Sequence, residues 1–110
     1  MLVITRFRVP SARADAFAAE LRAVADALGA RPGFGDGFVG RNLDDPTLWT
    51  LTTRWESVGA YRRALSSYDV KVASAGPYAF ALGEPSAYTD AYEDVVADAV
   101  QDDAPRDGNT

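Results

Sequence analysis

The residues best suited to chemistry in this sequence are two aromatic side chains, Trp55 and Tyr61, six positions apart. Trp55 ends the alternating apolar run Leu48–Trp55, and Tyr61 follows a potential helix cap at Ser57. The indole N–H and the phenol hydroxyl both donate hydrogen bonds from flat, largely apolar rings. If a strand ends at Trp55 and a helix begins after Ser57, both rings can face one hollow between sheet and helix. We therefore predict that Trp55 and Tyr61 are the catalytic residues.

Four further side chains are predicted to bind the substrate: Thr5, Phe7, Asp36 and Tyr68. Phe7 would supply an apolar wall with Thr5 on the same strand face, Tyr68 a second hydroxyl, and Asp36 a base if it is buried. A simpler structural interpretation exists for each kind of residue. The tryptophan and the phenylalanine can be core residues, the tyrosines an amphipathic helix stripe, and the aspartate a solvated surface group.

The sequence contains no histidine and no cysteine. Thiolate nucleophiles, disulfides and soft metal sites are thereby excluded, together with the commonest general base and haem ligand. No carboxylates are spaced as in a calcium-binding loop. We therefore expect no metal and no cofactor.

The charge is unevenly distributed along the 110 residues. The net charge is −5, and residues 93–110, with six acidic side chains and one arginine, account for all of it. Residues 1–92 are neutral and offer no basic footprint for nucleic acid. No apolar run is long enough to cross a bilayer and no signal peptide is recognisable, so a cytoplasmic location without membrane contact is expected. We predict one domain, residues 1–92, and an acidic tail, residues 93–110, that is partly disordered.

Hydrophobic periodicity predicts the elements that would position these residues. Strands are expected at Leu2–Val9, Phe34–Leu43, Leu48–Trp55 and Ser86–Tyr92. A helix is expected over about residues 12–28, capped by Ser11. A second helix is expected after Ser57, with a further turn at Asp69–Ala75; its predicted apolar stripe is Tyr61, Ala64, Leu65 and Tyr68.

The order of these elements is β-α-β-β-α-β, which predicts an α+β fold with a ferredoxin-like antiparallel sheet. Helices would cover one face of that sheet. The first strand nevertheless carries apolar residues on both faces, with Leu2 and Ile4 opposite Val3 and Phe7. An exposed sheet face is normally polar. We therefore expect the second face to be buried against another copy of the chain in a C₂ homodimer.

Three short motifs, RPGF at 31–34, RNLDDP at 41–46 and RWES at 54–57, occur in this order between the elements. Over residues 1–92 the chain resembles the antibiotic biosynthesis monooxygenase (ABM) family. The resemblance implies a dimeric α+β barrel in which each subunit keeps a pocket between sheet and helices. In members that oxidise anthrones to quinones, a Trp and a Tyr six residues later line this pocket, and Trp55 and Tyr61 match that pair.

The sequence departs from these members at two positions. Their Asn four residues before the Trp is Leu51 here, and no arginine stands some twenty residues after Trp55, where Lys71 is the nearest cation. The haem-degrading members use a His that this chain lacks and an Asn where Phe7 stands, so no haem is expected.

The resemblance implies a cofactor-independent monooxygenase that oxidises a small aromatic substrate, an anthrone or quinol of polyketide type, with O₂. Two alternatives stay open. One is a non-oxidative cyclase or isomerase that uses the same pocket. The other is a ligand-binding auxiliary protein without catalytic activity. The aromatic pair favours the first reading, and the departures at Leu51 and at the missing arginine favour the other two.

Overall fold

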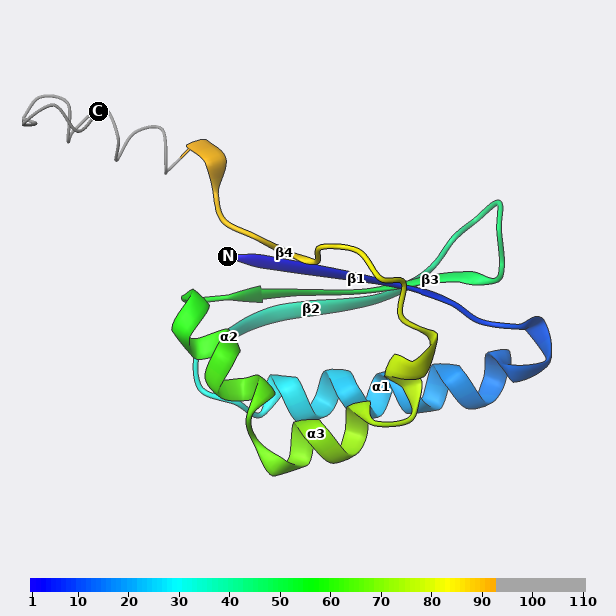
Figure 1. Ribbon diagram of the computed structural model, residues 1–110, viewed down its shortest axis with the longest axis horizontal. Helices are drawn as coiled ribbons and strands as arrows, with labels where there is room; N and C mark the ends of the chain where they lie inside the picture. The colour runs from blue at the N-terminus through cyan, green and yellow to red at the C-terminus, as the bar shows by residue number, and fades with distance from the viewer. Residues whose placement is uncertain (93–110) are drawn as a thin grey trace, which may run out of the picture.

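The computed structural model describes residues 1–92, and the predicted acidic tail lies outside the described residues. Four strands form one antiparallel sheet in the order β2-β3-β1-β4, and the helices pack against one of its faces (Figure 1). The strands are β1 (Leu2–Arg8), β2 (Phe34–Arg41), β3 (Leu48–Trp55) and β4 (Ala87–Tyr88). The helices are α1 (Ala14–Gly29), α2 (Val58–Leu65) and α3 (Tyr68–Ser74), with 3₁₀ turns η1 (Ser11–Arg13) and η2 (Pro77–Phe80). The predicted α+β, ferredoxin-like class is confirmed.

The core lies between α1 and the helix-facing side of β1 and β3. The predicted helical face of α1 is buried: Phe17, Leu21, Val24 and Leu28. Alternate residues of β3 are buried against it: Trp49, Leu51, Thr53 and Trp55. Each large apolar side chain buried in this way contributes about 1.5–3 kcal/mol. The prediction that Ser11 caps this helix is wrong, because Ser11 begins η1 and Arg13 precedes α1 without a side-chain bond.

The hairpin of β2 and β3 contains the bulge that its glycines predict. The pairing register shifts between Phe34 and Asp36, and a Cβ on Gly35 would lie 3.0 Å from the carbonyl oxygen of Arg54. β2 ends at Arg41, two residues earlier than predicted, because Asn42 already belongs to the turn. The bulge accommodates one extra residue, Gly35, near the start of β2.

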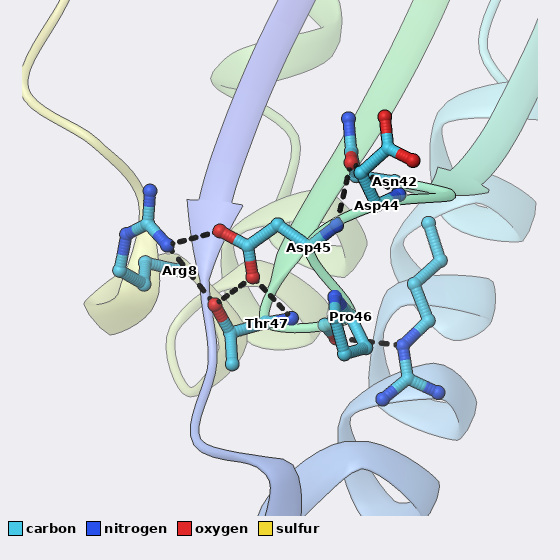
Figure 2. Close-up of polar contacts among 7 residues, drawn as sticks. Arg8, Asn42, Asp44, Asp45, Pro46 and Thr47 are labelled. Atoms are coloured by element: carbon cyan, nitrogen blue, oxygen red, sulfur yellow. Dashed lines mark hydrogen bonds and ion pairs between the residues drawn. The ribbon is translucent and has the colours of Figure 1, made fainter.

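The RNLDDP motif is a structural turn that connects β2 to β3 and holds both to β1 (Figure 2). The side-chain oxygen of Asn42 accepts from the backbone N–H groups of Asp44 and Asp45, at 2.9 and 2.8 Å. The Asp45 carboxylate accepts from the hydroxyl of Thr47 at 2.6 Å and from Arg8 at 2.8 Å. The hydrogen bond from Thr47, followed by that from Arg8, lowers the pKa of Asp45 to about 2. The motif therefore organises the turn and leaves no group of it for catalysis.

The helix predicted after Ser57 and the further helical turn predicted at Asp69–Ala75 are confirmed as α2 and α3. Ser57 caps α2 as predicted, accepting from the N–H of Ala60 at 3.1 Å. The chain then turns at Ser67, whose hydroxyl accepts from the N–H of Val70 at 3.3 Å and starts α3. This break changes the buried face from the one predicted. The buried residues are Ala60, Ala64 and Val70, whereas Leu65 and Tyr68 are exposed.

The segment after η2 runs along β1, and we call its residues 81–86 the strap. The strap is held by backbone hydrogen bonds from Leu82 N to Arg6 O at 2.8 Å and from Ile4 N to Ser86 O at 2.7 Å. The predicted strand Ser86–Tyr92 is too long, because regular pairing covers only Ala87–Tyr88. The strap has no regular alternation, and Pro85 cannot donate to a ladder.

The sheet face opposite the helices carries apolar side chains. Leu2, Ile4 and Leu48 lie on it half-buried, and Phe38 is 64% exposed. The helices visibly leave this face uncovered (Figure 1). Among residues 1–92, no helix combines the length and the hydrophobicity that a bilayer crossing requires.

Gly33 of the RPGF motif fixes the position of α2. It adopts φ of +87°, in the left-handed region, and a Cβ added to it would lie 2.4 Å from the Cβ of Ala60. Its carbonyl oxygen accepts from the N–H of Glu56 at 2.8 Å. Only glycine satisfies both the backbone angle and the close approach. The backbone of the turn before β2 thereby packs directly against the side chain of Ala60 in the first turn of α2.

We expect Gly33→Ala to lower the free energy of unfolding by about 2–4 kcal/mol, because left-handed strain and overpacking each cost about 1–3 kcal/mol. Gly83→Ala is the matched control, since nothing lies within 4 Å of a Cβ at that position. The control should stay within about 0.5 kcal/mol of the parent protein. Urea unfolding followed by circular dichroism measures both. Equal midpoints for the two variants would show that the packing at Gly33 does not matter.

Candidate active site

A cavity of about 190 Å³ lies between β1, α2, η2 and the strap. Four hydroxyl-bearing side chains line it, namely Ser86 of the strap and Thr5, Tyr61 and Tyr78. Apolar surface comes from Ile4, Ala81 and Leu82. At its exposed side Arg6 and Glu84 form a two-bonded ion pair, with N–O distances of 2.7 and 2.9 Å. The cavity is thus a small apolar space with neutral donors inside and a paired charge at its rim.

Each hydroxyl comes from a different element. Thr5 lies on β1 on the side that faces the helices, directly opposite Leu51 in the β1–β3 register. Tyr61 lies on the first turn of α2, next to Ala60, whose contact with Gly33 sets the helix position. Tyr78 lies on η2, which starts at the buried Pro77. The three groups converge because the strap and η2 return the chain to β1 after α3.

Burial governs the ionisation of the two tyrosines. Partial burial raises the pKa of Tyr61. Burial also raises the pKa of Tyr78 to about 12, and the charge of an ionised Tyr61 adds to this, while a side-chain hydrogen bond with Thr5 acts in the opposite direction. Both tyrosines therefore keep their protons near neutral pH, and their hydroxyls can donate hydrogen bonds.

Trp55 is buried beside Tyr61 and supports it without lining the cavity. The two rings lie 5.7 Å apart, and Phe34 packs edge-on against the other side of the indole at 5.2 Å. The indole N–H donates to the Thr53 hydroxyl at 2.8 Å within the buried core. The expectation that this N–H could donate to a substrate does not fit that bond, because the donor already has a partner. Trp55 therefore acts on the site through the position of Tyr61.

Phe7 supports the Tyr78 ring as Trp55 supports the Tyr61 ring. Its side chain is fully buried and meets the Tyr78 ring edge-on at 5.2 Å. Phe17 packs against its other side at 5.3 Å. Phe7 thus backs the cavity wall, while Thr5, two residues earlier on the same strand face, lines the cavity itself.

The structure does not bring two of the predicted residues to this cavity. Asp36 lies on β2 on the uncovered side of the sheet, and its carboxylate accepts from Arg54 at 3.3 Å. Tyr68 begins α3 and is 79% exposed. Asp36 was expected to be a base only if buried, and it is exposed. Tyr68 lies outside the predicted apolar stripe because α2 ends at Leu65 and α3 begins after Ser67.

Sequence reasoning missed Tyr78. The Gly76-Pro77 pair indicates a turn, and the segment after it has neither a helical nor an alternating pattern long enough to assign. The sequence feature that could have found Tyr78 is composition. Pro77, Tyr78 and Phe80 form a short, largely apolar segment, which is unusual in a solvent-exposed loop. The Tyr78 ring packs on Phe7, and the Phe80 ring packs on Phe17.

Other hollows on the described part of the chain include neither Trp55 nor Tyr61. One of about 450 Å³ lies between α1 and β2 and is lined mostly by small and apolar residues, with Asp26 as its charged group. Another of about 440 Å³ lies on the uncovered sheet face around Phe38 and Thr50. Within residues 1–92, no three acidic side chains gather in a way that could hold a metal ion. The hydroxyl-lined cavity is therefore the candidate active site.

Comparison with known proteins agrees with this fold. Residues 1–76 match the family model of the antibiotic biosynthesis monooxygenases. Among solved structures, SnoaB, a cofactor-independent oxygenase from Streptomyces nogalater, superposes with a TM-score of 0.72 at 21% identity, covering 81% of this chain and 90% of SnoaB. No curated protein matches the sequence.

Two further structures show the same architecture. A proposed antibiotic biosynthesis monooxygenase from Nitrosomonas europaea has a TM-score of 0.68 at 17% identity, covering 83% of this chain and 98% of that one. A conserved protein from Methanosarcina mazei has a TM-score of 0.67 at 16% identity, covering 78% of this chain and 84% of its own. At these identities the structures establish the fold alone.

Proposed function

Because this chain belongs to the antibiotic biosynthesis monooxygenase family, we propose that it is a cofactor-independent monooxygenase that oxidises a small aromatic substrate, an anthrone or quinol, with O₂. The observation that carries the proposal is a cavity whose lining combines the neutral hydroxyl side chains of Thr5, Tyr61 and Tyr78 with the apolar side chains of Ile4, Ala81 and Leu82. Such a cavity suits a flat aromatic molecule with one or more oxygen atoms. The likeness to SnoaB, described as a cofactor-independent oxygenase, supports the same reaction class.

In this reaction the substrate supplies the electrons. An anthrone loses a proton from its CH₂ group, and the resulting carbanion passes electrons to O₂. Overall the CH₂ becomes a C=O with one oxygen atom of O₂, and the other oxygen leaves with the two hydrogens as water. The protein's part is to orient the ring, stabilise the oxygen of the anion and exclude bulk water.

The residues divide this work by position. The Tyr61 hydroxyl, positioned by the Trp55 ring, donates a hydrogen bond to the anion oxygen. Thr5 adds a second polar contact, and Phe7 keeps the wall behind it rigid. A cavity of ~150 Å³ is enough to bind benzene. About 190 Å³ therefore holds one or two fused rings, and a third ring would extend past the Arg6–Glu84 pair.

A second candidate function has one specific observation in its favour. Leu51, at the position of the family's Asn, is buried in the core and offers no polar group. A non-oxidative cyclase or isomerase, or an auxiliary protein that only binds the ligand, would not need that group. The polar group at this level of the sheet comes instead from Thr5, across the ladder from Leu51.

We expect metal-free protein to accelerate O₂ consumption by 1,8-dihydroxy-9-anthrone, with the anthraquinone as product. Tyr61→Phe should lower kcat by about 10²-fold, the usual loss for one donor aimed at developing charge. Tyr92→Phe is the matched control, since Tyr92 is 77% exposed, and its rate should match that of the parent protein. An oxygen electrode and product absorbance measure the reaction.

O₂ uptake no faster than without protein, with the anthrone bound, would contradict the oxygenase and favour the cyclase or the binding protein. A rate unchanged by Tyr61→Phe would remove Tyr61 from the mechanism.

The uncovered sheet face supports a further part of the proposal, that the chain forms a face-to-face homodimer. Phe38 is 64% exposed there beside half-buried Ile4 and Leu48. An apolar face of this kind on a small domain marks a surface that another protein covers. The same face of a second copy is self-complementary under a two-fold axis.

Sedimentation at micromolar concentration should give twice the 11.8 kDa monomer mass. Phe38→Lys should raise the dimer dissociation constant at least about 10-fold, because it places a charge in an apolar contact. Leu43→Lys, at a hairpin tip that is 99% exposed, should leave the dimer intact. A monomer for the parent protein would refute the face-to-face arrangement.

A further inference from the structure

We propose that Tyr78 is a substrate-binding residue that donates a hydrogen bond from its hydroxyl to an oxygen atom of an aromatic ketone or phenolate bound in the cavity. This assignment rests on the proposed function only in taking the cavity as the ligand site. Tyr78 comes from η2, a turn that no motif in the sequence identifies. It faces the same space as Tyr61 and Thr5.

The polar groups around the cavity differ in whether they are already engaged. The Trp55 N–H is occupied by Thr53. The Arg6 guanidinium uses its Nε and Nη2 atoms for the carboxylate of Glu84. Thr5 is the polar neighbour of the Tyr78 hydroxyl in the cavity, and as a neutral group it can act as donor or acceptor. A phenol that accepts from threonine still has its own proton to donate.

The ring of Tyr78 is held in place before any ligand binds. It packs edge-on against Phe7, which is fully buried. The backbone of η2 is closed by hydrogen bonds from Ala79 N to Gly76 O and from Ala81 N to Tyr78 O, and Ala81 pairs with Phe7 in an isolated bridge. A donor fixed on both its side-chain and backbone sides loses little entropy when it binds a ligand.

Burial keeps the Tyr78 hydroxyl protonated. It raises the pKa of Tyr78 to about 12, with a smaller contribution from the charge of an ionised Tyr61. Tyr78 therefore remains a hydrogen-bond donor near neutral pH. A ligand with an oxygen that gains negative charge is the chemical class that such a constant donor recognises.

The test compares two ligands of one ring system, 1,4-naphthoquinone and naphthalene, by equilibrium dialysis. The parent protein should bind the quinone about 3–10-fold more tightly, the range that one net hydrogen bond provides. Tyr78→Phe keeps the ring contact with Phe7 and should remove this preference without weakening naphthalene binding. Tyr92→Phe is the control and should keep the preference.

If Tyr78→Phe does not fold, as judged by circular dichroism, Tyr78→Leu provides the same test, because it also removes the hydroxyl and keeps an apolar side chain against Phe7. A folded Tyr78→Phe that still prefers the quinone as the parent does would overturn the assignment. This binding test does not require anthrone oxidation. If the oxygenase proposal alone is wrong, the Tyr78-dependent preference for the quinone should remain. A parent protein that binds neither ligand would overturn both.

Discussion

The close packing of Gly33 on Ala60 is the constraint on which the rest of the site depends. A left-handed turn with no side chain lets the start of β2 touch the first turn of α2. Since Tyr61 follows Ala60, this contact also sets the depth and direction of the Tyr61 ring over Trp55. The bulge after Phe34 then returns β2 to register with β3. Fold and site are thus determined at one point, the RPGF turn.

The cavity's chemistry follows from which polar groups the fold satisfies and which it leaves to a ligand. A buried donor needs a partner, and the Trp55 indole finds one two residues earlier on its own strand face, at Thr53. That bond makes the tryptophan a rigid support. The hydroxyls of Thr5, Tyr61 and Tyr78 instead line a cavity whose charged groups, Arg6 and Glu84, pair with each other at the rim. Neutral donors in an apolar space stabilise a developing oxyanion with little cost of desolvation.

Sequence periodicity predicted those parts of the fold that a long, regular pattern specifies. Alternation located β1 and β3, and the 3-4 spacing located α1, because these elements each bury one complete face. After Ser66 the same reasoning succeeded only in part. The helical turn predicted at Asp69–Ala75 is confirmed as α3, but backbone hydrogen bonds to β1 hold the strap without any alternation of side chains. Tyr68 was consequently predicted to face the site, and Tyr78, placed there by the strap, was missed.

The most direct measurement of the account is a crystal structure of the protein with 1,8-dihydroxyanthraquinone, the product of the proposed reaction. The account predicts the ligand between β1, α2 and η2, with a ring oxygen within hydrogen-bond distance of the Tyr61 or Tyr78 hydroxyl. Part of the ring system should extend past Arg6 and Glu84, because a cavity volume of about 190 Å³ is too small to enclose three fused rings. A ligand found instead on the uncovered sheet face around Phe38, with the hydroxyl cavity empty, would contradict it.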